Sequence, residues 1–206
     1  MLLDYGSTDG LGHWVRTALL EALRDGRLKY FRAEMRRWHM SRAKNIAHRL
    51  GTRTVLCNLD ADNFAPAGFG DWLREVFLGG PAVTHADHQS YGGGYGRIAL
   101  LREDFLRLGG YDERLIGWGY DDEDLRRRAI ASGLRSVVAP LPFITFLRHS
   151  HAIRLLVPGA KTQEEDLAFG RAISHRSLAE GRLRANVGKE WGRALVRRFD
   201  EELILS

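Results

Sequence analysis

Cysteine is nearly absent from this chain: its 206 residues include one, Cys57, which can form no disulfide within the chain. A zinc finger or any other cysteine-rich metal site is therefore excluded. A chain without internal disulfides suits a reducing compartment, so we expect a cytoplasmic protein. Cys57 stands in the apolar run Thr54-Val55-Leu56-Cys57, and we expect it to be an inert core residue.

Long apolar runs are missing as well. No stretch is long enough to span a bilayer, and the N-terminus lacks the basic segment and cleavage site of a signal peptide. No internal repeat or low-complexity linker is visible. The length then predicts one well-cored domain with a small appendage. We place the domain at residues 1–160 and a C-terminal helical extension at residues 161–206.

Phosphate-binding glycine loops of the G-x-G-x-x-G or G-K-[ST] type are also lacking, since Gly92-Gly93-Gly94-Tyr95-Gly96 fits neither. The net charge of +5, from 31 basic and 26 acidic residues, still suits an anionic partner such as a phosphate or nucleotide. No basic run carries interleaved aromatic residues, so no nucleic-acid partner is expected. Peripheral contact with the inner face of a membrane stays open.

What is present is an alternation of strand and helix signals, which predicts an α/β layered domain with a largely parallel sheet. The expected strands are Met1–Leu3, Leu28–Phe31, Thr54–Cys57, Ala82–Thr84, Arg97–Arg102, Val137–Pro140 and Phe143–Phe146. The expected helices are Gly12–Asp25, Ser41–Leu50 with Ser41 as its cap, Asp71–Leu78, Glu103–Leu108, Asp121–Ser132, Glu164–Glu180 and Glu190–Leu203.

Carboxylates follow two of these strands. Asp60 and Asp62 stand at i and i+2 after an apolar run, so in an extended chain they lie on one face and can converge on one ligand. A cation such as Mg²⁺ or Mn²⁺ would let the two charges coexist. The short motif is equally compatible with a solvated turn. Asp4 also ends a strand, and ligands in parallel sheets gather at such ends.

Four consecutive acids, Asp121-Asp122-Glu123-Asp124, open a predicted helix behind Gly117-Trp118-Gly119. Acids at a helix N-terminus favour the helix dipole, but four adjacent carboxylates repel one another. A tryptophan between two glycines suggests a movable aromatic platform. Because sugars present C–H faces to aromatic rings and hydroxyls to carboxylates, this segment could bind a carbohydrate acceptor.

Histidines and arginines complete the candidate set. His149 and His151 stand at i and i+2 after an apolar strand, a spacing that suits metal binding, although single histidines are more often surface or core residues. Arg193 and Arg197 are expected on one face of the last helix, with Arg198 beside them, either in solvent or on an anionic partner.

Together these motifs resemble the glycosyltransferase A-type (GT-A) fold, and more specifically the family 2-type enzymes with a β-galactosyltransferase C-terminal region. The resemblance covers roughly residues 2–151. The segment Asp4–Gly10 resembles the nucleotide-binding D-x-G-S-x-D-G loop, with Tyr5 where many members have a second acid. Ser41–Asn45 resembles the helix start that faces the donor. By this resemblance, the donor-binding residues are Asp4, Ser7, Asp9, Lys44, Asn45 and Asp60.

The most specific part of the resemblance is a series of motifs in the family's order. They are the glycine-rich strand Gly96–Arg102, then Phe105-Leu106, the turn Gly109–Tyr111, the loop Gly117–Gly119 and the acids Asp121–Asp124. The resemblance implies that Asp122 is the general base and that Asp121 orients the acceptor. It assigns Trp118 and Gly96, with Asp121, to substrate binding.

The resemblance further implies a divalent metal, Mn²⁺ or Mg²⁺, held by Asp60, Asp62 and His149, the last in an R-H-S segment. A histidine ligand favours Mn²⁺. Phe146 stands where galactosyltransferases have a methionine ligand, so water, Asp60 or His151 would have to replace it. The family's first strand–loop–helix unit has no counterpart ahead of Asp4. Three explanations are open: a fragment, a strand supplied by a partner, or a truncation that weakens donor binding.

The resemblance thus implies an inverting, metal-dependent transfer of a sugar from a nucleotide-sugar donor to a glycan or other hydroxyl acceptor, as in polysaccharide biosynthesis. We expect the donor to be UDP-linked. The alternative is a degenerate GT-A module that binds a nucleotide sugar or glycan without turnover. A nucleotidyltransferase would also use carboxylates and a metal, but it would need a glycine-rich phosphate loop near the N-terminus.

Overall fold

A computed structural model describes residues 1–35, 37–87, 96–147, 162–198 and 202–204 of the chain. The chain divides into two compact units, which we describe separately. The first unit comprises Met1–Gly51 and Gly188–Ser206, and the second unit comprises Thr52–Val187. The expected division at residue 160 remains a prediction. Within the described residues, no helix is long and apolar enough to cross a bilayer.

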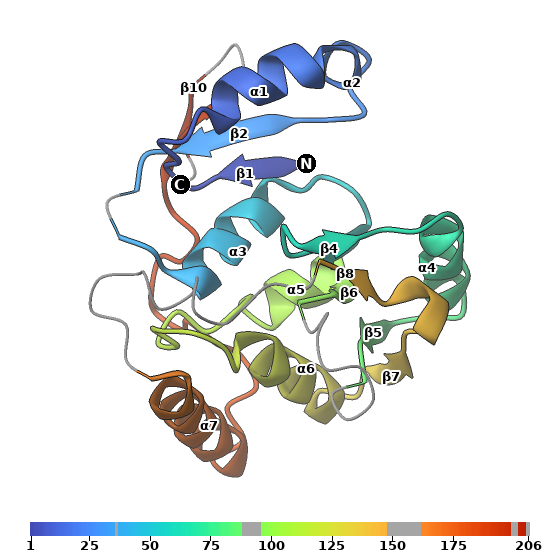
Figure 1. Ribbon diagram of the computed structural model, residues 1–206. Helices are drawn as coiled ribbons and strands as arrows, with labels where there is room; N and C mark the ends of the chain where they lie inside the picture. Colours follow the sequence, from blue (N-terminus) through green and yellow to red (C-terminus); the bar gives the residue numbers. More distant parts are fainter. Residues whose placement is uncertain (36, 88–95, 148–161, 199–201, 205–206) are drawn as a thin grey trace. The chain divides into compact units, whose positions relative to one another are not determined.

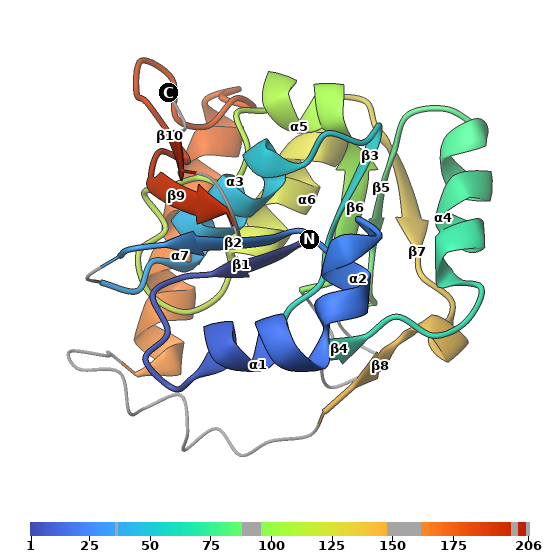
Figure 2. The same cartoon turned by 90° about the horizontal axis from the view of Figure 1, so that it is seen from above.

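The first unit is a four-stranded sheet with helices on both faces. Its elements are β1 (Leu2–Asp4), α1 (Leu11–Ala18), α2 (Leu20–Arg24), β2 (Tyr30–Ala33), α3 (Met40–Leu50), β9 (Leu195–Arg198) and β10 (Glu202–Ile204). The strand order is β1-β2-β9-β10. The β1–β2 pair is parallel, and β9 runs antiparallel to β2 and β10. Helices α1 and α2 lie on one face and α3 on the other (Figures 1 and 2).

The core of the first unit lies between its sheet and α3. Phe31 and Ala33 on β2, Ile46 on α3 and Val196 on β9 form one buried cluster. Helix α3 is capped by His39, whose ring nitrogen accepts a hydrogen bond from the Arg42 amide at 3.3 Å. The prediction that Ser41 caps this helix is wrong, because Ser41 is the second residue of α3 and is fully buried.

The predicted helix over Glu190–Leu203 is also wrong, since β9 and β10 occupy this stretch. Val196 is fully buried and its neighbours in β9 are exposed, so the burial pattern is that of a strand. Arg193 precedes β9 and pairs with Glu190, whereas Arg197 lies on β9. The two arginines therefore share no helix face. Pairing with β2 outweighs the helical preference of this arginine-rich stretch.

The second unit contains the remaining elements. They are β3 (Val55–Asn58), β4 (Asn63–Phe64), α4 (Phe69–Leu78), β5 (Ala82–His85), β6 (Ile98–Leu101), α5 (Arg102–Arg107), α6 (Asp121–Ala131), β7 (Arg135–Val138), the 3₁₀ turn η1 (Leu141–Phe143), β8 (Thr145–Phe146) and α7 (Gln163–Ala179). The main sheet has the order β3-β6-β5-β7, and β4 pairs with β8. Helix α4 lies on one face, α5 and α6 lie on the other, and α7 packs on α6 (Figure 2).

Apolar side chains fill both faces of this main sheet. Phe69 and Leu73 of α4 pack against Ala99 on β6. On the other face, Phe105 and Leu125 are fully buried, and burying a side chain of this size contributes about 1.5–3 kcal/mol.

The predicted fold class, a mixed α/β domain, is confirmed. The prediction of a largely parallel sheet is wrong in detail, because only β1–β2 and β5–β7 are parallel among the described strand pairs. The others run antiparallel. A run of apolar residues indicates a strand but does not specify the direction of its neighbour.

Candidate functional site

The predicted nucleotide loop begins at Asp4, at the end of β1, where the carboxylate is completely buried. One carboxylate oxygen accepts the Ser7 amide hydrogen at 2.7 Å, and the other accepts the Tyr30 hydroxyl at 2.7 Å. Arg32 lies 3.4 Å from the same carboxylate and also donates to the Ser7 carbonyl at 2.9 Å. Asp4 therefore holds the start of the loop in shape.

The protonation state of Asp4 follows from these contacts. Burial favours the neutral acid, but the hydrogen bonds from Tyr30 and Ser7, together with Arg32, hold the pKa of Asp4 below its ordinary value. Burial and the same hydrogen bond raise the pKa of Tyr30 to about 12. Asp4 is thus ionised and Tyr30 protonated at neutral pH.

The other predicted donor residues of the first unit differ in exposure. Asp9 is exposed and accepts the Leu11 amide hydrogen at 3.1 Å where α1 begins. Lys44 and Asn45, on α3, are buried. Direct contact of these residues with a nucleotide stays a prediction.

An aromatic residue beside this loop was missed from the sequence. Trp38 is 57% exposed, and its ring meets the Tyr5 ring edge-on at a centroid distance of 5.4 Å. A large exposed ring next to a nucleotide loop is suited to stacking on a base. The available signal was an isolated tryptophan just ahead of a predicted helix, outside any apolar periodicity.

Charge is divided unequally between the units. The first unit has 14 of the 31 basic residues and nine of the 26 acids, so it carries the entire net charge of +5. The second unit is neutral. An excess of positive charge on the unit with the predicted nucleotide loop favours a phosphate-bearing ligand.

The predicted metal motif follows β3 in the second unit. The Asn58 amide donates to the Asp60 carboxylate at 2.9 Å and to the Gly96 carbonyl at 2.6 Å. A Cβ atom at Gly96 would lie 1.8 Å from a carboxylate oxygen of Asp60. Because Gly96 has no side chain, the Asp60 carboxylate can occupy the position that a Cβ atom would otherwise take. The structure thus brings two predicted site residues, Asp60 and Gly96, together.

These residues fit a divalent cation. Asp62 accepts the Asn63 amide at 2.8 Å, so both carboxylates of the motif are oriented by an asparagine. Oriented carboxylate oxygens suit Mg²⁺ or Mn²⁺. Among the described residues, no group of three or more His, Cys, Asp or Glu side chains is close enough to hold a metal ion. The expected third ligand, His149, lies outside the described residues, as does His151.

The four acids at the start of α6 divide into two pairs. Glu123 forms two hydrogen bonds with Arg126, at 2.6 and 2.8 Å. Asp124 pairs with Arg128 at 2.8 Å, and both side chains are 1% exposed. Glu123 and Asp124 thus have structural partners within the helix. Asp121, which is buried, and Asp122, which is half-buried, are the two to which the resemblance assigns catalytic roles.

The turn Gly109-Gly110-Tyr111 is fixed by residues that the sequence did not reveal. Arg128 donates to the Gly110 carbonyl at 2.8 Å. Asn186 donates to the carbonyls of Gly109 and Tyr111 at 2.8 and 2.7 Å. A Cβ atom at Gly109 would lie 2.2 Å from the Ala185 carbonyl oxygen. Position 109 requires a glycine because the backbone of Ala185, which is distant in the sequence, leaves no room for a side chain there.

The predicted acceptor loop, residues 117–120, also has a missed partner. The Trp118 amide donates to the Asp166 carboxylate at 2.9 Å. Asp166 lies in the first turn of α7 and is buried. The sequence did not indicate this contact, because acids are common in the first turn of a helix and Asp166 is one of three in that turn.

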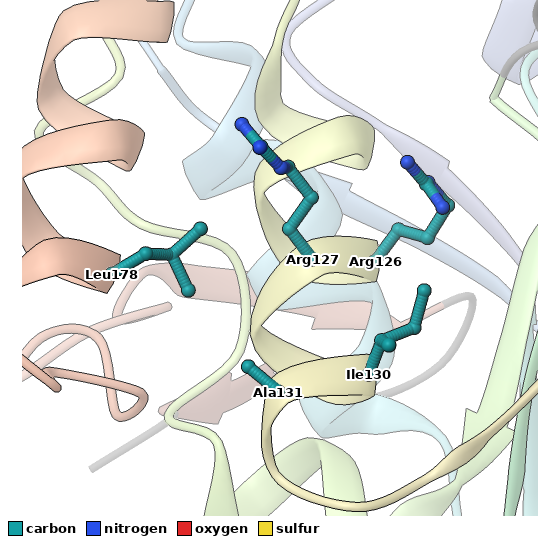
Figure 3. A pocket seen from close by; sticks show the side chains of 5 residues that line it. All are labelled: Arg126, Arg127, Ile130, Ala131 and Leu178. Carbon is teal, nitrogen blue, oxygen red and sulfur yellow. The ribbon is translucent and has the colours of Figure 1, made fainter.

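A hollow of about 420 Å³ lies between α6 and α7. It is lined by Arg126, Arg127, Ile130 and Ala131 of α6 and by Leu178 of α7 (Figure 3). Arg126 is bonded to Glu123, and Arg127 donates to the Tyr120 hydroxyl at 3.1 Å. None of the predicted site residues is among those that line this hollow.

Sequence comparisons agree with the motifs. Residues 83–152 match the family model described as the N-terminal domain of galactosyltransferase. Human chondroitin sulfate synthase 3 is 45% identical over 42 residues, which is 20% of this chain and 5% of that protein. Human chondroitin sulfate N-acetylgalactosaminyltransferase 2 is 36% identical over 56 residues, which is 27% of this chain and 10% of that protein. The chain thus spans a small part of these curated relatives.

Structural comparison extends the likeness to most of the chain. The mannosyltransferase PcManGT from Pyrobaculum calidifontis, solved in complex with GDP-Man and Mn²⁺, superposes with a TM-score of 0.62 at 24% identity. The match covers 84% of this chain and 54% of that one. The chain therefore shares the fold of this mannosyltransferase and, over residues 83–152, matches the sequence pattern of a galactosyltransferase domain.

Proposed function

We propose that this protein transfers a sugar, with inversion and with a divalent metal, from a nucleoside-diphosphate sugar to a hydroxyl of a glycan or other acceptor. The observation that carries the proposal is the contact between Asp60 and Gly96. It joins the carboxylate motif to the glycine-rich strand, two motifs of one family that are far apart in the sequence. A solvated turn would not require a glycine against its carboxylate.

Asp60, Asp62 and His149 would hold Mn²⁺ or Mg²⁺. When bound, the cation would offset negative charge that develops on the nucleoside diphosphate as it leaves. Leu147, two residues before His149, donates its amide hydrogen to the Asp62 carbonyl at 2.7 Å. This contact supports the assignment because it fixes Leu147, which is close to His149 in the sequence, beside the carboxylate motif.

The chain's own side chains would carry the remaining steps. Asp122 would accept the proton of the acceptor hydroxyl as this oxygen attacks the anomeric carbon on the face opposite the leaving group. This single displacement inverts the anomeric centre through an oxocarbenium-like transition state. Asp121 would orient the acceptor, and Trp118 would cover the site and exclude water, which otherwise hydrolyses the donor.

A UDP-linked donor is proposed, with GDP-linked sugars as the principal competitors, because PcManGT was solved with GDP-Man. The positive first unit and the exposed Trp38 support a nucleotide ligand. The acceptor is proposed to be a glycan because the curated relatives are named as chondroitin sulfate enzymes.

The test is a panel of UDP- and GDP-sugars with Mn²⁺ and glycan acceptors, with release of nucleoside diphosphate as the readout. We expect turnover with at least one donor and its loss on chelation of the metal. Asp122→Asn and His149→Ala should each lower transfer by about a hundredfold or more, the scale of general-base and metal contributions.

Glu123→Gln is the matched control, because Glu123 is adjacent to Asp122 but pairs with Arg126. It should retain activity. Full activity of Asp122→Asn would contradict the assigned base, and full activity of His149→Ala would contradict the assigned ligand. Nucleotide binding in calorimetry without turnover of any donor would instead support the non-catalytic binding module.

A further inference from the structure

Helix α7 and the loop 117–120 make a series of close contacts, although more than 40 residues separate them in the sequence. A Cβ atom at Gly119 would lie 2.9 Å from Leu167, and one at Gly170 would lie 2.8 Å from Tyr120. Glycines on both sides thus let the loop approach the helix closely. The glycines flanking Trp118 are therefore explained by packing on α7 as well as by any mobility of the loop.

The central contact is between Asp166 and the loop backbone. A Cβ atom at Gly117 would lie 2.5 Å from one carboxylate oxygen of Asp166, while the other oxygen accepts the Trp118 amide hydrogen at 2.9 Å. Asp166 is 9% exposed. Among the residues that the structure describes, the Trp118 amide is the hydrogen-bond donor to this carboxylate.

A buried carboxylate is unfavourable unless polar partners compensate for its lost hydration. The N-terminus of α7, where Asp166 lies in the first turn, offsets part of this penalty. The charge-assisted hydrogen bond to Trp118 offsets more. Within the part of the chain that the structure describes, the contacts of the Asp166 carboxylate are with the backbone of the loop at Gly117 and Trp118.

The far end of the loop is held by α7 as well. Tyr120 has a φ of 70° and is the residue that precedes α6. Its hydroxyl lies 3.2 Å from the ring nitrogen of His175 on α7 and accepts a hydrogen bond from Arg127 at 3.1 Å. The backbone is thus fixed on both sides of Trp118, immediately before Asp121 and Asp122.

We propose that Asp166 is a positioning residue: it holds loop 117–120 against α7 in an ordered conformation and so presents Trp118 next to the start of α6. The role of Asp166 in sugar transfer rests on the proposed function. The contact by which Asp166 holds the loop is independent of that function and can be measured without any substrate.

The experiment compares amide hydrogen exchange at residues 117–119 in the wild type and three variants of the full chain. Asp166→Ala should accelerate exchange of the Trp118 amide by about tenfold or more, the scale of a lost hydrogen bond to a charged group. Asp166→Asn keeps an acceptor oxygen and should restore most of the protection. Glu164→Ala, which removes an exposed acid from the same helical turn, should leave it unchanged.

Kinetics then tests the positioning role. In Asp166→Ala we expect the KM for the acceptor to rise with little change in the KM for the donor, and Asp166→Asn should recover the wild-type values. A circular dichroism melt of each variant confirms that α7 remains folded.

Unchanged exchange at Trp118 in a folded Asp166→Ala variant would overturn the proposal. Faster exchange with an unaltered acceptor KM would overturn the positioning role. If the wild type transfers no sugar from any donor, the proposed function fails, and the exchange measurement still decides whether Asp166 holds the loop.

Discussion

Asp4 shows how one buried carboxylate can order a whole loop. Its two oxygens are bonded to the Ser7 amide and the Tyr30 hydroxyl, so the loop is shaped from inside by a charge that solvent does not reach. Cys57 is the contrasting case. Burial raises the pKa of this thiol to about 12, which keeps it protonated and agrees with the expected inert residue.

The Asp4 contacts predict a pH-dependent effect on stability. The pKa of Asp4 is lowered in the folded state, so its contribution is present above the unfolded value of 3.8 and is lost as pH falls through the folded value. Asp4→Asn should therefore lower the free energy of unfolding by about 2 kcal/mol at pH 7, the scale of a lost hydrogen bond to a charged group.

Urea unfolding at pH 7 and at stepwise lower pH measures this difference, which should shrink as the wild-type carboxyl becomes protonated. Asp9→Asn is the control, because this carboxylate is in the same loop but is exposed. A difference between Asp4→Asn and wild type that is independent of pH would contradict the ionised, bonded carboxylate.

Trp38 gives a second prediction for a single residue. If its ring stacks on the donor base, Trp38→Ala should weaken UDP binding by about tenfold or more, since stacking of a base on an aromatic side chain contributes about 1–3 kcal/mol. Trp14→Ala is the matched control, because Trp14 is 52% exposed in the same unit but lies on α1. Calorimetric titration with UDP measures both, and equal affinities of the two variants would exclude stacking on Trp38.

At the scale of elements, the informative contact joins β3 to β6. These strands pair antiparallel, with Asn58 opposite Ile98. Their ends therefore bring the residues after β3 next to those before β6. Asn58 bonds to both sides of this junction, the Asp60 carboxylate and the Gly96 carbonyl.

Replacement of Gly96 by alanine should disturb this junction. The added Cβ would overlap the Asp60 carboxylate, which would have to leave its hydrogen bond with Asn58. We expect Gly96→Ala to weaken Mn²⁺ binding by about tenfold or more, as for loss of a residue that orients a ligand. Titration with Mn²⁺ in the presence of UDP is the measurement.

Gly70→Ala serves as the control for this substitution, since a Cβ at Gly70 on α4 meets no atom within 4 Å. If Gly96→Ala binds Mn²⁺ as well as Gly70→Ala does, Asp60 is not a ligand whose orientation matters. Such a result would also remove the main support for the proposed function.

At the scale of the whole molecule, the chain consists of two units of different electrostatic character. The unit with the Asp4 loop carries all of the net positive charge, and the unit with the Asp60 and Asp122 motifs is neutral. The positive charge of the first unit matches the anionic nucleotide that is proposed as its ligand, whereas the metal and the acceptor are proposed to bind residues of the second unit.

The sequence by itself determined the positions of most helices and strands and the carboxylate, glycine and tryptophan motifs. These signals are local, because apolar periodicity and turn residues act over a few positions. The GT-A resemblance rested on the same local motifs, and it agrees with the structural comparison.

Only the tertiary structure decided which partner each element meets. Pairing with β2 makes Leu195–Arg198 a strand and not part of a helix. The tertiary structure also set Asp60 against Gly96 and Asp166 against Trp118. Such contacts join residues tens of positions apart, and no local pattern specifies them, because they depend on how the packed elements bring distant backbone together.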